Sequence, residues 1–361
     1  MTASLYIASV QPFSGKSLAA LAVGLWLREA GLRVGYFKPL GTLPHEVRGL
    51  TTDEDAYFIA SHLDPDAPPE HLCPVLLTPE LAARAVRGEL EDLRGRIRAA
   101  YAALAADREV MVVGGIGTLS RGSLLGISAP AVAELLDARA LVLAKSLEHA
   151  AVEEVLLARR LLGERMIGVV FNYAQPEDRE TLEAGLRSYL EHQGIAVLGL
   201  VPRDELLGAV TVGDLEEHLP AKLLCCEKAR DDLIVHFVVG AMGVQSAARY
   251  FRQLADKAVI TGGDRADIQL AALQTATRAL VLTGNIHPSG VIVRRAQQLG
   301  VPLLLAPHDT LATVERIEGI AGRVRVRESA KVERGRALFA HHVDLDRIRR
   351  GLGLRAPSEV P

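Results

Sequence analysis

The fold is decided by the loop Ser9-Val10-Gln11-Pro12-Phe13-Ser14-Gly15-Lys16-Ser17, which joins a predicted strand to a predicted helix. The apolar run Leu5–Val10 precedes the lysine, and Ser17–Ala30 follows with leucines at helical spacing. Backbone N–H groups at such a turn attract phosphate oxygens, as does the positive end of the helix. A lysine there reaches the terminal phosphates and a hydroxyl binds Mg²⁺, roles that Lys16 and Ser17 can fill. The loop therefore predicts a phosphate-binding P-loop; the alternative is a structural turn.

The loop departs from an ideal P-loop at two positions. Val10 stands where the first glycine is expected, and Pro12 has no N–H to offer a phosphate. The remaining residues still predict a nucleotide site, made by Phe13, Ser14, Gly15, Lys16 and Ser17.

Short apolar runs alternate with helical patterns over the first 205 residues, which predicts a doubly wound α/β fold with a parallel sheet. The predicted strands are Leu5–Val10, Arg33–Lys38, Val110–Gly114, Ala140–Lys145 and Met166–Asn172. The predicted helices are Ser17–Ala30, Pro79–Ala105 with a break near Gly88, Pro130–Leu136, Ala150–Leu162 and Pro176–His192. Ligands are expected along the edge where the strands end.

Composition limits the classes of function. With 361 residues the chain is long enough for two domains. Its 41 basic and 44 acidic residues and its 4% aromatic content argue against nucleic acid as a partner. Three cysteines without CxxC spacing indicate a reducing compartment and no zinc site. No signal peptide or membrane span is evident, so we expect a cytoplasmic protein without a membrane partner.

A second candidate cation ends the next predicted strand, in Tyr36-Phe37-Lys38-Pro39-Leu40-Gly41. Lys38 at a strand end beside a phosphate loop is well placed to contact a substrate or a terminal phosphate. The alternative is a solvated lysine with no role in binding.

These residues resemble dethiobiotin synthetase and the cobyrinic acid amide synthase group over roughly residues 4–205. The resemblance rests on the GKS loop, the KPLG segment, Asp53-Glu54-Asp55-Ala56, Val112-Val113-Gly114-Gly115-Ile116-Gly117 and Gly168-Val169-Val170-Phe171-Asn172. It implies ATP (or GTP) and Mg²⁺ as ligands, with Lys16 and Lys38 as the catalytic cations of an active member.

The same resemblance implies further site residues. Ser17 and Asp55 would hold the metal, and Asn172 would read the nucleotide base. Pro202, which ends the family's GxxP segment at Gly199-Leu200-Val201-Pro202, would also contact the nucleotide. Asn172 could instead be an ordinary turn residue. The family's metal-binding glutamate corresponds to Gly114, which cannot ligate Mg²⁺, so the pattern favours nucleotide binding over turnover.

The remainder of the chain resembles the DRTGG domain, which in long bacterial phosphate acetyltransferases follows a domain of this P-loop type. The resemblance rests on Val259-Ile260-Thr261-Gly262-Gly263-Asp264-Arg265-Ala266-Asp267 and Asp309-Thr310-Leu311-Ala312-Thr313. We predict a P-loop domain over 1–207, a smaller α/β DRTGG-like domain over 208–325 and a helical tail over 326–361. In those enzymes the acetyltransferase domain lies beyond this module, so this chain is expected not to make acetyl phosphate by itself.

Glycine-rich strand ends in the second domain suggest an effector site. Thr261, Gly262 and Gly263 let backbone N–H groups approach an anion, and Arg265 supplies charge. A structural turn is the alternative.

Two classes of function remain open. The favoured one is a nucleotide-binding regulatory or sensor protein, homodimeric through its second domain, whose partner is a small anionic effector, a phosphate acetyltransferase or another metabolic enzyme. The other is an ATP-dependent, Mg²⁺-requiring ligase of the dethiobiotin synthetase or cobyrinic acid diamide synthase type.

Overall fold

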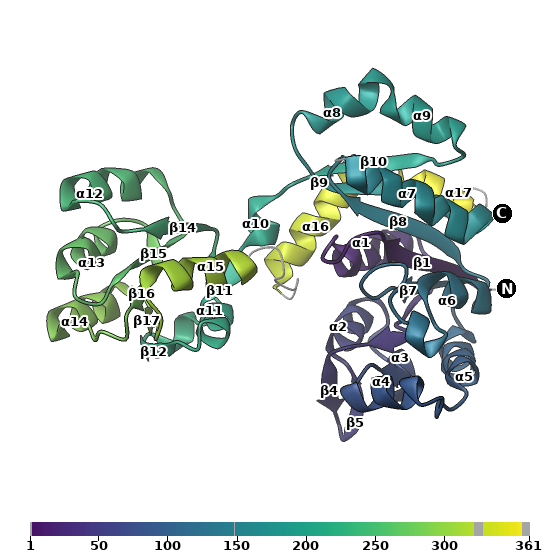
Figure 1. The fold of residues 1–361 in the computed structure, drawn as a ribbon, viewed down its shortest axis with the longest axis horizontal. Helices are drawn as coiled ribbons and strands as arrows, with labels where there is room; N and C mark the ends of the chain where they lie inside the picture. Colours follow the sequence, from purple (N-terminus) through teal and green to yellow (C-terminus); the bar gives the residue numbers. More distant parts are fainter. Residues whose placement is uncertain (1, 148, 321–327, 356–361) are drawn as a thin grey trace. The chain divides into compact units, whose positions relative to one another are not determined.

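The computed structural model describes residues 2–147, 149–320 and 328–355, which form two compact units (Figure 1). The first unit comprises residues 1–203 together with 326–361, and the second comprises 204–325. The second unit is therefore an insertion between two segments of the first.

The first unit is built on a parallel sheet of strand order β10-β9-β8-β1-β7-β2. The chain passes from β1 outward to β2, returns to β7 and then crosses to β8 on the other side of β1. The strand order therefore reverses beside β1, where doubly wound folds place their ligands. The strands are β1 (Ala3–Ser9), β2 (Val34–Phe37), β7 (Val110–Gly114), β8 (Arg139–Lys145), β9 (Met166–Ala174) and β10 (Val197–Pro202).

Nearly continuous apolar runs form these strands because both faces of the sheet are covered by helices. The helices are α1 (Lys16–Glu29), α2 (Glu54–Leu63), α3 (Pro69–Leu72), α4 (Pro79–Val86), α5 (Leu93–Ala105), α6 (Ala129–Leu135), α7 (His149–Leu162), α8 (Asp178–Thr181) and α9 (Arg187–His192). Two small ladders lie outside the main sheet: β3 (Leu40–Gly41) with β6 (Val75–Leu76), and the hairpin of β4 (Pro44–Val47) with β5 (Leu50–Asp53). The predicted doubly wound α/β class is confirmed.

The prediction of one continuous helix over 176–192 was wrong. A π-turn at Leu182–Leu186 separates α8 from α9, because Gly185 takes a φ of 143° that an α-helix cannot contain. The predicted break near Gly88 does occur, between α4 and α5, where Gly88 has a φ of 73°.

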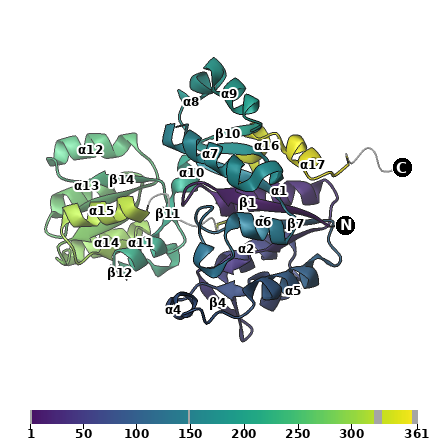
Figure 2. The ribbon, with the colours of Figure 1, turned by 45° about the vertical axis from the view of Figure 1, so that its right-hand side comes forward.

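The C-terminal helices α16 (Ser329–His342) and α17 (Leu345–Gly351) pack on the first unit, although they follow the second unit in sequence. In Figures 1 and 2 the yellow α16 lies beside α1 and β10. Gly335 of α16 meets Leu18 of α1 so closely that a Cβ there would lie 2.1 Å from a leucine methyl. Val343 extends the contact through a bridge to Gly199 of β10.

The second unit has a five-stranded sheet of order β12-β17-β16-β15-β14, parallel except for β12. Helices α12, α13 and α14 contribute to the core on one face, and α11 and α15 to the core on the other. The strands are β11 (Val210–Thr211), β12 (Lys222–Cys225), β13 (Leu233–Ile234), β14 (His236–Val239), β15 (Lys257–Gly262), β16 (Thr277–Thr283) and β17 (Leu303–Leu305). The helices are α10 (Glu205–Gly208), α11 (Val212–His218), α12 (Val244–Gln253), α13 (Ala266–Leu273), α14 (Gly290–Leu299) and α15 (Thr310–Ile320).

Candidate nucleotide site

The P-loop leads directly from β1 into α1. Gly15 caps the helix with a φ of 88°, a conformation that favours glycine, and Lys16 is the first helical residue. Helix α1 is 14 residues long, so its N-terminus carries the unpaired N–H groups and positive dipole end that bind phosphate. The predicted strand, loop and helix are all present in this order.

The ammonium of Lys16 is held at the loop by two acceptors. Its Nζ donates to Ser9 Oγ and to the Gly117 carbonyl oxygen, each at 2.7 Å. Burial, together with the positive charges of Lys38 and Lys145, lowers the pKa of Lys16 to about 8. These partners hold the ammonium close to the loop.

Asn172 contacts the loop itself. Its side-chain Nδ2 donates to the Ser14 carbonyl oxygen at 3.0 Å, and both residues are buried. A Cβ at Gly15 would lie 2.5 Å from the same Nδ2, so a glycine is also needed there for space. The amide therefore fixes the shape of the P-loop. Ser14 Oγ is fully buried and has no hydrogen-bond partner among the described residues.

Lys38 lies in a buried ion pair. Its Nζ is 2.7 Å from Asp53 Oδ1 and 3.4 Å from Asp55 Oδ2. Burial opposes the charged form, but the carboxylates of Asp55 and Asp53 outweigh it and raise the pKa of Lys38. Lys38 is therefore charged at neutral pH. It is not the solvated lysine that was the alternative, since it is only 6% exposed.

Asp53 was not singled out by the sequence analysis, yet it organises this cluster. It caps α2 by accepting from the Ala56 N–H, and its other oxygen accepts from the N–H groups of Thr42 and Leu43. An aspartate at the residue before a helix is a recognisable capping signal. With Lys38 as a fourth partner, its carboxylate is fully used within the protein.

The space beside Gly114, where the related synthetases carry a metal-binding glutamate, is filled by another side chain. Tyr36 places its hydroxyl where a side chain at Gly114 would stand. In the described part of the chain no group of three or more histidine, cysteine, aspartate or glutamate side chains could hold a metal.

The other predicted contact residues lie as follows. Phe13 is half exposed at the loop with a φ of 54°, and Ser17 is exposed in the first turn of α1. Pro202 ends β10, where it pairs with Ala174 of the neighbouring β9.

The candidate effector residues of the second unit lie at the end of β15. Gly263 packs against the backbone of the next loop, since a Cβ there would lie 1.7 Å from the Ile286 carbonyl oxygen. Arg265 pairs with Asp267, and the carbonyls of Gly262 and Gly263 accept from Gln269. Thr261 donates to the Gly240 carbonyl oxygen at 3.4 Å.

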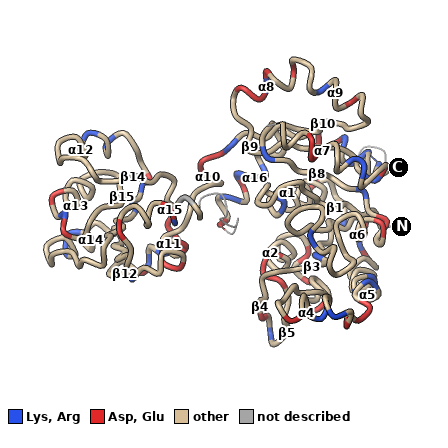
Figure 3. Tube along the Cα trace, viewed as in Figure 1, with Lys and Arg blue, Asp and Glu red and all other residues tan. Residues whose placement is uncertain are grey.

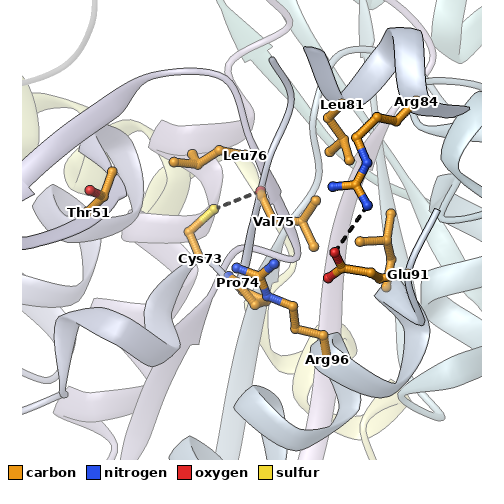
Figure 4. A pocket seen from close by; sticks show the side chains of 10 residues that line it. Thr51, Cys73, Pro74, Val75, Leu76, Leu81, Arg84, Glu91 and Arg96 are labelled. Carbon is orange, nitrogen blue, oxygen red and sulfur yellow. Dashed lines mark hydrogen bonds and ion pairs between the residues drawn. The ribbon is translucent and has the colours of Figure 1, made fainter. Parts of the chain in front are cut away.

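A cavity of about 260 Å³ lies elsewhere in the first unit (Figure 4). Figure 4 shows Arg84 paired with Glu91 on one side, and Cys73 and Arg96 on the other. None of the predicted nucleotide-binding residues lines it.

Together these features define a P-loop nucleotide-binding protein. Residues 3–211 match the AAA domain family model, and residues 214–320 match the DRTGG domain model. The chain belongs to the AAA domain family, and the predicted pairing of a P-loop domain with a DRTGG domain is confirmed.

The curated relatives are phosphate acetyltransferases. The one from Synechocystis is 24% identical over 96% of this chain and 51% of its own length. The chain spans about half the length of the curated relatives it matches.

Solved structures show partial likeness. Cobyrinic acid a,c-diamide synthase from Mycobacterium smegmatis is 18% identical, with a TM-score of 0.35 over 56% of this chain and 87% of that one. The septum site-determining protein MinD complexed with Mg-ADP, from Pyrococcus horikoshii, is 14% identical, with a TM-score of 0.36 over 57% of this chain and 84% of that one.

Surface charge and hydropathy add two findings. Figure 3 shows basic and acidic residues interspersed along both units. Among the described residues, no helix has the length and apolar character needed to cross a membrane.

Proposed function

We propose that these residues form a nucleotide-binding regulatory or sensor module related to the non-catalytic half of phosphate acetyltransferase. The observation that carries the proposal is the pair Tyr36 and Gly114, since the P-loop keeps its lysine while the expected metal carboxylate is replaced by a tyrosine hydroxyl. Binding needs the loop, the helix N-terminus and the lysines. Phosphoryl transfer also needs charge stabilisation by a well-held metal.

The proposed ligand is ATP or GTP. Its phosphates would contact the loop from Phe13 to Ser17, and its Mg²⁺ would be held by Ser17 and Asp55. In this proposal the Nδ2 of Asn172 positions the loop, and Asn172 and Pro202 would contact the nucleotide. No acetyltransferase activity is proposed for these residues, because the AAA and DRTGG matches together account for residues 3–211 and 214–320.

The partner proposals concern the second unit. Thr261, Gly262, Gly263 and Arg265 are proposed to take a small anionic effector, and a phosphate acetyltransferase or another metabolic enzyme is the proposed protein partner. A homodimer is proposed through α12, α13 and α14, where exposed apolar side chains occur on all three helices: Val244, Tyr250, Leu270, Val291 and Leu299. A fragment of residues 204–325 that sediments as a monomer at high micromolar concentration would rule out this dimer.

The test of nucleotide binding is a thermal-shift series with ATP, GTP and Mg²⁺. A ligand at one hundred times its Kd stabilises by about 2.7 kcal/mol, so the melting temperature should rise measurably. Lys16→Ala should abolish the rise, and Lys222→Ala, at an exposed lysine of the second unit, should leave it unchanged. An equal rise in all three proteins would place binding elsewhere.

Phosphate release separates regulation from the ligase alternative. We expect little or no hydrolysis of saturating ATP. Turnover of about 1 s⁻¹ or more, the ordinary range for enzymes, would favour a ligase in which Lys16 and Lys38 act as catalytic cations.

A further inference from the structure

Lysine is rare in this chain, and its distribution is uneven. Of 41 basic residues only seven are lysines, and within residues 1–207 they are Lys16, Lys38 and Lys145. Lys16 follows β1, Lys38 follows β2 and Lys145 ends β8, so all three stand at the carboxyl edge of one parallel sheet. Lysine presents a compact charge with three donors, whereas arginine presents a planar fork, and the two are not interchangeable. The use of lysine at these three strand ends, in a chain that otherwise favours arginine, suggests that the three lysines serve one ligand.

Lys145 adjoins the P-loop by strand register. Strand β8 lies directly beside β1, and Leu143 is opposite Ser9, so Lys145 is level with the loop. Its backbone N–H donates to Gln11 Oε1 within the loop at 2.8 Å. Its ammonium lies 5.5 Å from the ring centre of Tyr173. The charge on Lys145 acts on Lys16, as described above.

The carboxylates near this edge of the sheet already have partners within the protein, so they are weak candidates for metal ligands. Asp53 is fully used by Lys38 and three backbone N–H groups. Asp55 faces Lys38, and Tyr36 fills the space beside Gly114. The three ammonium groups outnumber the two carboxylates of Asp53 and Asp55, so this edge keeps a positive charge that attracts a polyphosphate.

We propose that Lys145 is a third phosphate ligand of the site, and that Lys16, Lys38 and Lys145 together supply most of the charge neutralisation that a protein-held magnesium ion would provide. The inference rests on the proposed nucleotide binding and names its ligand more closely: a nucleoside polyphosphate, bound with or without Mg²⁺. Lys16 would contact the phosphates from the loop, Lys145 from the end of β8 beside β1, and Lys38 from the end of β2, which β7 separates from β1.

The experiment is isothermal titration calorimetry of ATP into the full chain at neutral pH, with Mg²⁺ or with EDTA. For the wild-type protein we expect EDTA to raise the Kd by less than about tenfold, which is 1.4 kcal/mol. Lys145→Met removes the charge and keeps most of the side-chain volume, and it should raise the Kd in EDTA by about tenfold or more. Lys145→Arg should recover part of the affinity, and Lys222→Met should match the wild type.

The outcomes separate this inference from the proposed function. Wild-type protein that binds ATP only with Mg²⁺, or a Lys145→Met variant with unchanged affinity in EDTA, overturns the lysine site and leaves nucleotide binding intact. Wild-type protein that binds ATP under neither condition overturns both. If Lys145→Met does not fold, a competition titration on the wild-type protein replaces it. Inorganic tripolyphosphate should compete with ATP in EDTA, and failure to compete overturns the inference.

Discussion

The hydroxyl oxygen of Tyr36 lies 2.0 Å from the point where a Cβ at Gly114 would stand. Tyr36 is on β2 and Gly114 ends the neighbouring β7, so the tyrosine closes the place where a metal-binding carboxylate would project. The tyrosine is buried, and burial with the nearby charges of Asp55 and Asp53 raises its pKa well above the usual value. It is therefore a neutral hydroxyl at physiological pH, and Gly114→Glu alone cannot restore the carboxylate.

Gly114→Ala should destabilise the protein by about 1–3 kcal/mol, the usual cost of overpacking a core. Tyr36→Phe removes the atom that clashes first, so the double variant should lose less than the sum of the single losses. Urea unfolding of the four proteins measures this coupling. Additive losses would show that Gly114 and Tyr36 do not compete for the same space.

Asp53→Ala should lower the free energy of unfolding by about 3–5 kcal/mol, because it leaves the buried Lys38 ammonium short of a partner and removes the cap of α2. Asp55→Ala is the matched control: its carboxylate is 23% exposed and more distant, so the loss should stay below about 1 kcal/mol. Chemical denaturation gives both values, and equal losses would contradict the assignment of Asp53 as the main partner.

Asn172→Ala should weaken ATP and GTP binding by a similar factor of about tenfold, since the lost hydrogen bond to Ser14 shapes the loop for any phosphate. A residue that reads the base would instead change the ratio of the two affinities. Calorimetric titration with both nucleotides distinguishes the two roles. A selective loss for one nucleotide would assign Asn172 to base recognition.

Nucleotide affinity should fall above about pH 8. The pKa of Lys16 is lowered to about 8 in the free protein, so at higher pH the ammonium must regain a proton before it binds phosphate. The Kd should then rise toward tenfold per pH unit, because one proton is taken up with each ligand. Lys16→Arg stays charged, and its affinity should change little over this range. A parallel fall in that variant would assign the titration to another group.

A fragment of residues 1–207 should be less soluble and less stable than a chain in which residues 1–203 are joined to 328–355 by a flexible linker. Without α16, the apolar surface of α1 around Leu18 is uncovered. Residues 204–325 form a compact unit with their own core and should fold alone. Equal stability of the two proteins, measured by circular dichroism, would show that α16 is dispensable.

The sequence predicts five of the six strands of the main sheet to within two residues at each end, because each is a buried apolar run between turns; β10 was not among the predicted strands. It did not predict the small hairpin of β4 and β5, whose strands are short and partly exposed. The meeting of Tyr36 and Gly114 was also beyond prediction, since both residues were placed on strands but the order of the strands was not known. Lys145 ended a predicted strand, and its signal was the scarcity of lysine elsewhere in the first 207 residues.

The path of the chain through the two units has a consequence for communication between ligands. The second unit is inserted into the first at two points in the sequence. The chain leaves the first unit after β10, the neighbour of the strand that carries Asn172. It rejoins the first unit at α16, which packs on the helix that begins with Lys16. The two segments of the first unit that flank the insertion in sequence, β10 and α16, therefore both contact elements of the first unit that shape the phosphate site. If an effector of the second unit changes the nucleotide affinity, bound nucleotide must alter the effector's affinity by the same factor.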